Sequence, residues 1–286
     1  MKDMSRKKMT PYLFLAPALI LFLCFTAYPI IASLILSFQS FEGGSYVFSG
    51  LSNYTRLIGD TIFRKALLNT LIILVIQVPI MLFLGLILAN ALNNQLLKFR
   101  GFFRVGIYMP AVTSLVAYSI LFSIMLQDAG IINQFLGYLG IGPISWLSDP
   151  FWAKGSIILA MTWRWTGYNM VIYLSAMQSI SEEIYEAASI DGASSMRKFF
   201  YITIPQLKPI ILFTAIISTI STLQLFDEPF NLTKGGPADA TMTLGLYIYN
   251  NGFKYFDFSY ASAVAYVVVV IVAILSYFQS KVTGDE

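Results

Sequence analysis

Six long apolar runs, separated by short polar segments, constrain this 286-residue chain more than any other feature of its sequence. Each run supplies the roughly 20 residues that a helix needs to cross a bilayer core about 30 Å thick. A tilted barrel strand needs only about 10 residues and alternates between apolar and polar side chains, which these runs do not. The runs therefore predict an all-α membrane protein with six transmembrane helices. They lie near residues 12–37, 67–92, 102–126, 152–176, 209–230 and 259–280.

The composition agrees with this fold class and narrows the chemistry. Hydrophobic residues make up 57% of the chain and charged residues 12%, with a mean hydropathy of +0.71. A net charge of +3 from scattered basic residues gives no reason to expect a nucleic-acid partner. Cys24 is the single cysteine and histidine is absent, so the usual disulfide, zinc and haem ligands are missing. We therefore expect neither a metal site nor a cofactor in this chain.

The distribution of lysine and arginine predicts the orientation in the membrane. With a cytoplasmic N-terminus, eleven of these residues fall on the cytoplasmic side and six on the opposite side. The positive-inside rule therefore places both termini in the cytoplasm. Residues 177–208 then form a cytoplasmic loop, and no loop reaches the roughly 50 residues that a separate domain usually needs. We expect a single transmembrane domain over residues 1–286.

The cytoplasmic loop carries the pattern of two short helices. Ile180, Ile184, Ala187 and Ala188 recur at helical spacing, and Ser179 and Glu182 have the spacing of a capping box. Gly192 suits the left-handed residue that ends a helix.

A second helix is predicted directly after Gly192. Ser194 or Ser195 caps it, Met196 and Phe199 begin its apolar face, and Pro205 and Pro209 are expected to stop it. Spacing alone allows two roles for the pair of helices, an anchor at the membrane surface or a docking element for a partner protein.

Ten positions of this loop resemble the EAA loop of binding-protein-dependent ABC importer permeases. They are Glu186, Ala187, Ala188, Asp191, Gly192, Ala193, Phe199, Ile202, Pro205 and Pro209. The stretches YLFLAPALILFLCFTAYPIIASLILSF and LTKGGPADATMTLGLYIY resemble the carbohydrate-uptake branch, specifically the first membrane subunit of the maltose, glycerol phosphate and multiple-sugar class. Ser181 stands where many relatives have proline.

The resemblance implies a type I ABC importer permease in a bacterial or archaeal cytoplasmic membrane. The implied function is ATP-driven import of a sugar, with an oligosaccharide expected. The implied partners are a second homologous permease, a cytoplasmic ATPase dimer and an extracellular sugar-binding protein, with membrane lipid around the spans. This chain has no G-x-x-x-x-G-K-[ST] motif, so ATP and Mg are expected in the partner ATPase and the chain itself is no enzyme. The residues implied in ATPase coupling are Glu186, Ala187, Ala188, Asp191 and Gly192.

Candidates for the substrate pathway concentrate in MTWRWTGYNM of the fourth run, because aromatic faces and fixed hydrogen-bonding groups suit sugars. Trp163 is the first choice, since the family resemblance places a sugar contact at that distance before the EAA loop. Arg164 lies near mid-membrane and is expected either to pair with Asp227 or Glu228, with Asp227 preferred, or to contact the ligand. Aromatic helix packing would explain the same residues. The full set is Trp163, Tyr168, Arg164, Asn169, Gln224 and Asp227, with Thr113, Ser114 and Tyr118 as further candidates.

Two other classes of function are compatible with a polytopic membrane protein. An ion-coupled secondary transporter or channel subunit also carries charges inside the membrane. An intramembrane hydrolase needs a nucleophile and a base, and without histidine the chain can form neither a Ser-His dyad nor an H-E-x-x-H site.

Overall fold

The computed structural model describes residues 12, 14–94 and 96–284 and is mostly helical. Its contacts cluster into two compact units. The first comprises Met1–Asp60 with Ile248–Val269, and the second Thr61–Tyr247 with Val270–Glu286. The expectation of one transmembrane domain stays a prediction.

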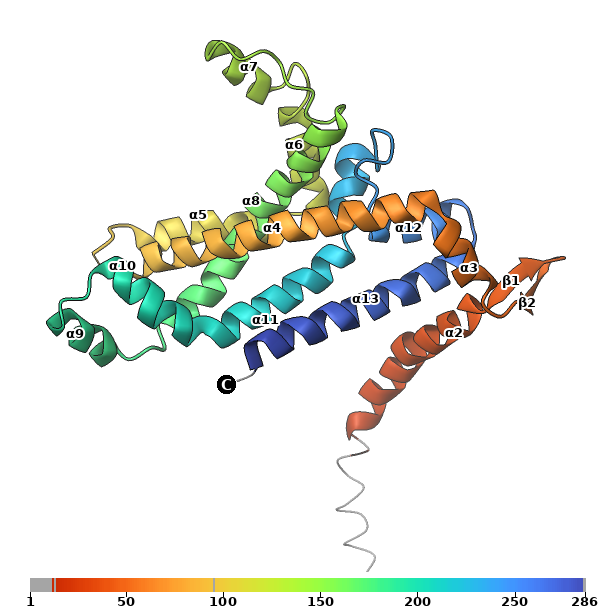
Figure 1. Cartoon of the computed structure of the whole chain (residues 1–286), viewed down its shortest axis with the longest axis horizontal. Coiled ribbons are helices and arrows are strands. Elements are labelled where there is room, and N and C mark those ends of the chain that lie inside the picture. Colours follow the sequence, from red (N-terminus) through yellow and green to blue (C-terminus); the bar gives the residue numbers. More distant parts are fainter. Residues whose placement is uncertain (1–11, 13, 95, 285–286) are drawn as a thin grey trace, which may run out of the picture. The chain divides into compact units, whose positions relative to one another are not determined.

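The first unit holds a small β-hairpin that the all-α prediction did not include. An apolar helix, Phe14–Ser37, contains η1 (Leu23–Ala27) and ends with α2 (Tyr28–Ser37). Strands β1 (Gln39–Glu42) and β2 (Ser45–Phe48) follow and pair antiparallel beside the end of α2 (Figure 1). The buried Asn53 of α3 (Ser52–Gly59) donates to the Ser37 and Gln39 carbonyls at 2.9 and 2.8 Å, which fixes the base of the hairpin. The later part of this unit contains η4 (Asn250–Lys254) and the start of α13 (Phe258–Gly284).

The second unit is built around α4, α8 and α11. A 33-residue helix, α4 (Thr61–Asn93), packs along the 28-residue α8 (Pro150–Met177), and α11 (Ile204–Leu223) lies against both (Figure 1). Asp149 caps α8 by accepting from the Phe151 and Trp152 amides, and Pro150 suits its first turn. The remaining elements are α5 (Arg100–Val112), α6 (Leu115–Met125), α7 (Ile131–Tyr138), α9 (Glu182–Ile190), α10 (Ser195–Lys198), η2 (Phe199–Thr203), η3 (Pro229–Thr233) and α12 (Leu244–Tyr249).

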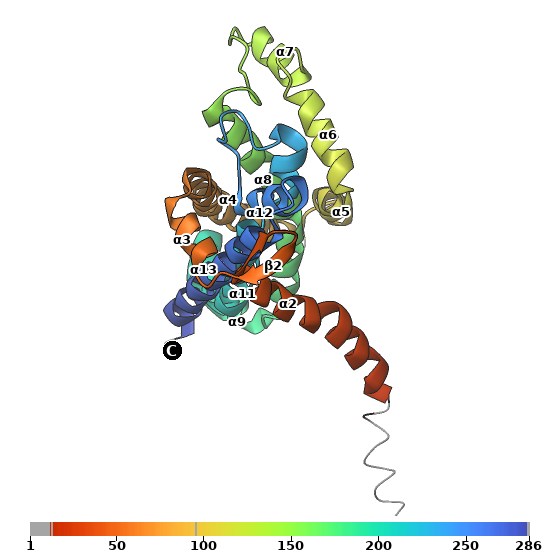
Figure 2. The same ribbon diagram turned by 90° about the vertical axis from the view of Figure 1, so that its right-hand side faces the viewer.

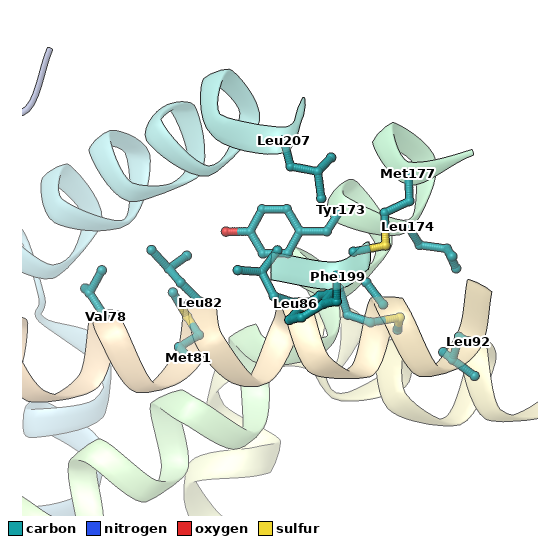
Figure 3. Packing of buried hydrophobic residues seen from close by; sticks show 12 residues of the cluster. Val78, Met81, Leu82, Leu86, Leu92, Tyr173, Leu174, Met177, Phe199 and Leu207 are labelled. Atoms are coloured by element: carbon teal, nitrogen blue, oxygen red, sulfur yellow. The ribbon is translucent and has the colours of Figure 1, made fainter. Parts of the chain in front are cut away.

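Tyr173 of α8 lies at the centre of the main apolar cluster (Figure 3). Its ring is fully buried between Leu207 of α11 and the α4 side chains Leu82 and Leu86. Its hydroxyl shares a 2.6 Å hydrogen bond with Thr214 of α11, so the polar end of the ring is satisfied inside the apolar core. This cluster holds the three long helices together.

Among the described residues, four helices are long and apolar enough to cross a membrane, and a bent pair makes a fifth if it counts as one span. The four are Phe14–Ser37, Thr61–Asn93, Ser195–Leu223 and Phe258–Lys281. Helix α8 is not among them, although it covers the predicted fourth span. These helices confirm a multi-pass membrane protein, while the number six and the position of the termini stay predictions.

The predicted third span is not one straight helix. Helices α5 and α6 meet at a bend of 97° (Figure 2). Thr113 and Ser114 between them adopt extended backbone angles, directly after Pro110 has removed one helical hydrogen bond. The bent pair covers the span expected near 102–126, and whether it crosses the membrane as one broken span stays a prediction.

The expectation that Pro205 and Pro209 stop a helix was also wrong. The helix runs from Ser195 to Leu223 through both prolines. A π turn, Phe199–Thr203, directly precedes Pro205, and the Ile204 amide donates to the Phe199 carbonyl five residues back. The wider turn shifts the backbone where a proline ring would otherwise meet the preceding turn, so the helix continues.

Candidate functional site

A cavity of about 420 Å³ lies within the second unit, between α4, α8, α11 and the segment that follows α11. Two aromatic side chains, Trp165 and Tyr168, form part of its wall, with ring centroids 5.9 Å apart and ring planes at 89°. Polar side chains form much of the rest. These are Gln77, Asn169, Thr214, Ser218, Ser221, Thr222, Gln224, Asp227 and Glu228. Flat rings combined with hydroxyl, amide and carboxyl groups suit a polar ligand with an apolar face.

Two amide side chains are held in this wall before any ligand arrives. Gln77 and Asn169 are both buried, and each donates towards the Met81 sulfur, at 3.2 and 3.6 Å. Asn169 also donates to the Trp165 carbonyl at 3.1 Å. The Gln77 side-chain carbonyl has no hydrogen-bond partner within the described residues. An unmade bond of a buried polar group is costly, so this oxygen is a local weakness of the cavity wall.

The structure brings together four of the six residues predicted for the pathway. Tyr168, Asn169, Gln224 and Asp227 line the cavity, and Trp163 and Arg164 do not. Trp163 is 42% exposed, and its ring lies 5.4 Å from that of Phe122 and 6.4 Å from that of Tyr118. Its predicted contact with sugar stays a prediction.

Sequence reasoning missed Trp165 as the tryptophan of the cavity wall. Trp165, Tyr168, Asn169 and Ile172 all line the cavity, and they fall at i, i+3, i+4 and i+7. Residues at this spacing share one face of a helix, and Trp163 lies off that face. The periodicity was therefore present in the sequence and identifies Trp165 without the structure.

Arg164 does not form the predicted ion pair with Asp227. Within the described residues its Nε and Nη1 atoms have no hydrogen-bond partner, although the side chain is 5% exposed. Its guanidinium carbon lies instead 4.6 Å from the Tyr118 ring centroid and 5.3 Å from that of Trp165. Cation–π contacts of this kind are strongest where water is excluded, so two ring faces take the place of a carboxylate.

Glu228, and not Asp227, is the carboxylate of this buried cluster. Glu228 is 3% exposed and accepts a hydrogen bond from the Tyr118 hydroxyl at 2.5 Å. Since Glu228 lines the cavity, Tyr118 connects a wall of the site to the arginine behind it.

The loop over residues 177–208 has the predicted two helices, with a different start. Ser181 caps α9 by accepting from the Glu183 amide, whereas Ser179 donates back to the Ala176 carbonyl, so the expected capping box at Ser179 was wrong. Gly192 has φ +75° and joins α9 to α10, whose cap is Ser194. That left-handed glycine and that cap are as predicted.

The loop offers a largely exposed surface. Glu186, Ala187, Asp191 and Gly192 are exposed and Ala188 is partly buried. Apolar side chains on the same loop are exposed too, with Ile190 at 88% and Met196 at 67%. Glu186 also lines a second cavity, of about 550 Å³, which lies between α9 and the ends of α4, α5 and α8.

Long apolar helices surround a cavity that combines aromatic and aliphatic side chains with hydroxyl, amide and carboxyl groups, and an exposed pair of short helices follows α8, an arrangement typical of a membrane permease. Residues 62–282 match the family described as "Binding-protein-dependent transport system inner membrane component". The chain belongs to this family. It is a family of transport permeases and not of enzymes, which agrees with the sequence-based expectation.

Relatives extend over nearly the whole chain. The lactose transport system permease protein LacF of Rhizobium radiobacter is 55% identical, over 94% of this chain and 92% of its own length. The arabinooligosaccharides transport system permease protein AraP of Bacillus subtilis is 37% identical, over 98% of this chain and 90% of its own. These names confirm the resemblance to carbohydrate-uptake permeases.

Solved structures confirm the fold. A bacterial alginate ABC transporter in complex with alginate pentasaccharide-bound periplasmic protein contains a chain with a TM-score of 0.86 and 24% identity, covering 98% of this chain and 95% of that one. A second structure of a bacterial ABC transporter that imports alginate gives a TM-score of 0.87 over 99% of this chain and 97% of that one. The architecture is that of a type I ABC importer permease.

Proposed function

We propose that this chain is one of two permease subunits of an ATP-driven oligosaccharide importer. The observation that carries the proposal is the cavity, in which Trp165 and Tyr168 stand beside a wall of hydroxyl, amide and carboxyl groups. A sugar ring stacks on an aromatic face while its hydroxyls pair with fixed polar groups, so this wall suits a carbohydrate. Relatives named for lactose and arabinooligosaccharide transport support a substrate of a few sugar units.

The proposed assembly contains a second homologous permease, a dimer of cytoplasmic ATPase subunits and an extracellular sugar-binding protein. In it the chain crosses a bacterial or archaeal cytoplasmic membrane six times, with α8 as the fourth span and both termini in the cytoplasm. The ATPase binds ATP and Mg. Exposed residues of the loop, namely Glu186, Ala187, Ala188, Asp191 and Gly192, dock on it. The exposure of Ile190 and Met196 supports this assignment, because exposed apolar groups favour association.

Reconstitution in proteoliposomes tests the proposal. The chain is assembled with the permease, ATPase and binding protein from the same genomic neighbourhood, and uptake of labelled lactose and arabinooligosaccharides is measured. We expect uptake that requires ATP on the ATPase side and binding protein on the other side. An ion-coupled transporter, the alternative that the family does not favour, would accumulate sugar along an ion gradient without ATP. That result would contradict the proposal.

Replacing Trp165 by alanine is expected to reduce sugar uptake by roughly fivefold, since an aromatic contact contributes about 1 kcal/mol beyond its buried area. Trp163→Ala is the matched control, because it removes the same side chain from a neighbouring position outside the cavity wall. We expect it to change uptake by less than about threefold. Uptake is measured across sugar concentrations with basal ATP hydrolysis as a second readout. If Trp163→Ala lost more sugar uptake than Trp165→Ala, Trp163 would be the residue that contacts the sugar.

A further inference from the structure

One hydrogen bond ties the first helix of the cytoplasmic loop to the base of α11. The Tyr185 hydroxyl of α9 and the Thr203 hydroxyl lie 2.9 Å apart. Thr203 is the last residue of the π turn, directly before α11, and is 3% exposed, while Tyr185 is half-buried. A bond at a site from which water is largely excluded holds its partners more firmly than one at the surface.

A second contact braces the loop on its exposed side. The Lys198 ammonium of α10 donates to the Ser189 hydroxyl of α9 at 2.5 Å. The connecting turn adds backbone bonds, from the Ala193 amide to the Ala188 carbonyl at 2.9 Å and from Gly192 to Ser189 at 3.1 Å. With these bonds at the turn and Tyr185 at the other end of α9, α9 and α10 are held as one body.

The start of α11 is packed in the main apolar core. We therefore expect a movement of this end to shift the whole helix and not to be lost in a local change of its first turn. Phe199 of the π turn and Leu207 of α11 are both buried in the cluster around Tyr173 (Figure 3). From Thr203 the helix continues to Leu223, and its side chains Thr214, Ser218 and Ser221 line the cavity. At 1.5 Å per residue, Ser218 lies about 22 Å along the helix from Thr203.

We infer that Tyr185 and Thr203 are positioning residues that transmit movement of the docked loop to the cavity wall through α11. The inference rests on the proposed function. Without this bond, α9 keeps its connection to α11 through the Gly192 turn and the short α10, and loses its hydroxyl contact with the buried Thr203. The loop can then move with the ATPase while the cavity wall stays in place, so that ATP is hydrolysed without transport.

The test uses the whole reconstituted transporter and the variants Tyr185→Phe and Thr203→Val, which remove one hydroxyl each and keep the shape of the side chain. The readout is the ratio of sugar transported to ATP hydrolysed, together with the amount of ATPase that co-purifies. We expect the ratio to fall about fivefold in either variant, the factor that loss of one ordinary hydrogen bond produces in an equilibrium. Hydrolysis and co-purification are expected to stay within about twofold. The double variant should be no worse than either single one, because both remove the same bond.

Two controls separate transmission from general damage. Thr203→Ser keeps the hydroxyl and should keep the ratio of the unaltered transporter. Tyr201→Phe removes a tyrosine hydroxyl from the same π turn, where that side chain is 77% exposed, and should also have no effect.

The outcomes are distinct. An unchanged ratio in Tyr185→Phe and Thr203→Val overturns the inference, and loss of co-purified ATPase overturns it too, because the pair then acts in docking. If the unaltered transporter shows no ATP-dependent sugar uptake, the proposed function itself fails.

Discussion

Gly167→Ala is expected to prevent recovery of folded permease. A Cβ atom at this position in α8 would lie 1.9 Å from the Ile107 carbonyl oxygen and 2.7 Å from its carbon. Both atoms belong to the backbone of α5, so relief requires the two packed helices to separate. Overpacking a well-packed core costs about 1–3 kcal/mol when side chains can adjust, and more here because none is available to move. The yield of monodisperse protein in detergent and its thermal midpoint measure the effect.

Gly155→Ala is the matched control on the same helix. A Cβ at Gly155 has no neighbour within 4 Å, so the added methyl group meets open space. Alanine also favours a helix over glycine by about 1 kcal/mol, so yield and thermal midpoint should be equal or slightly higher. Wild-type yield and midpoint for Gly167→Ala would show that α5 and α8 are not in the close contact described.

Much of the helical fold could be predicted from the sequence, because a bilayer demands long apolar runs. The first and last runs match helices Phe14–Ser37 and Phe258–Lys281 within two residues at each end. Local rules failed where packing overrides them. Pro205 normally marks a helix boundary, yet the π turn before it allows the helix to continue. Nothing local in the sequence reports the burial of Phe199 and Thr203 that accompanies that turn.

The candidate site could be predicted only where residue type and helix face agree. Tyr168 and Asn169 satisfy both conditions and line the cavity, whereas Trp163 has the residue type without the face. Asp227 and Glu228 are neighbours in the sequence and have nearly the same predicted depth in the membrane. That depth therefore did not show which of them belongs to the Arg164 cluster. The difference is made by Tyr118, whose hydroxyl reaches Glu228 from the separate helix α6.

The buried cluster of Arg164, Tyr118 and Glu228 carries the second large expected effect. Arg164 cannot shed its proton in practice, and within the described residues no ion pair neutralises it. Two aromatic rings lie beside its guanidinium instead, and one of them, Tyr118, donates its hydroxyl to Glu228. Replacing Glu228 by an apolar residue therefore leaves the Arg164 cation, which is 5% exposed, with ring faces alone. Replacing both Glu228 and Arg164 leaves an apolar contact.

Glu228→Leu is therefore expected to destabilise the permease by about 1–3 kcal/mol, because the buried Tyr118 hydroxyl loses its acceptor and the Arg164 cation keeps ring faces alone. Adding Arg164→Met should restore part of that loss, because an apolar replacement of both groups leaves no uncompensated charge. The same cycle with Asp227→Leu in place of Glu228→Leu is the control, and we expect it to be additive within about 0.5 kcal/mol. Thermal unfolding of the detergent-solubilised complex measures both cycles. The opposite result would be non-additive losses of stability for Arg164 with Asp227 and additive losses for Arg164 with Glu228. It would mean that Arg164 pairs with Asp227, as expected from the sequence, and that the bond from Tyr118 to Glu228 serves only the cavity wall.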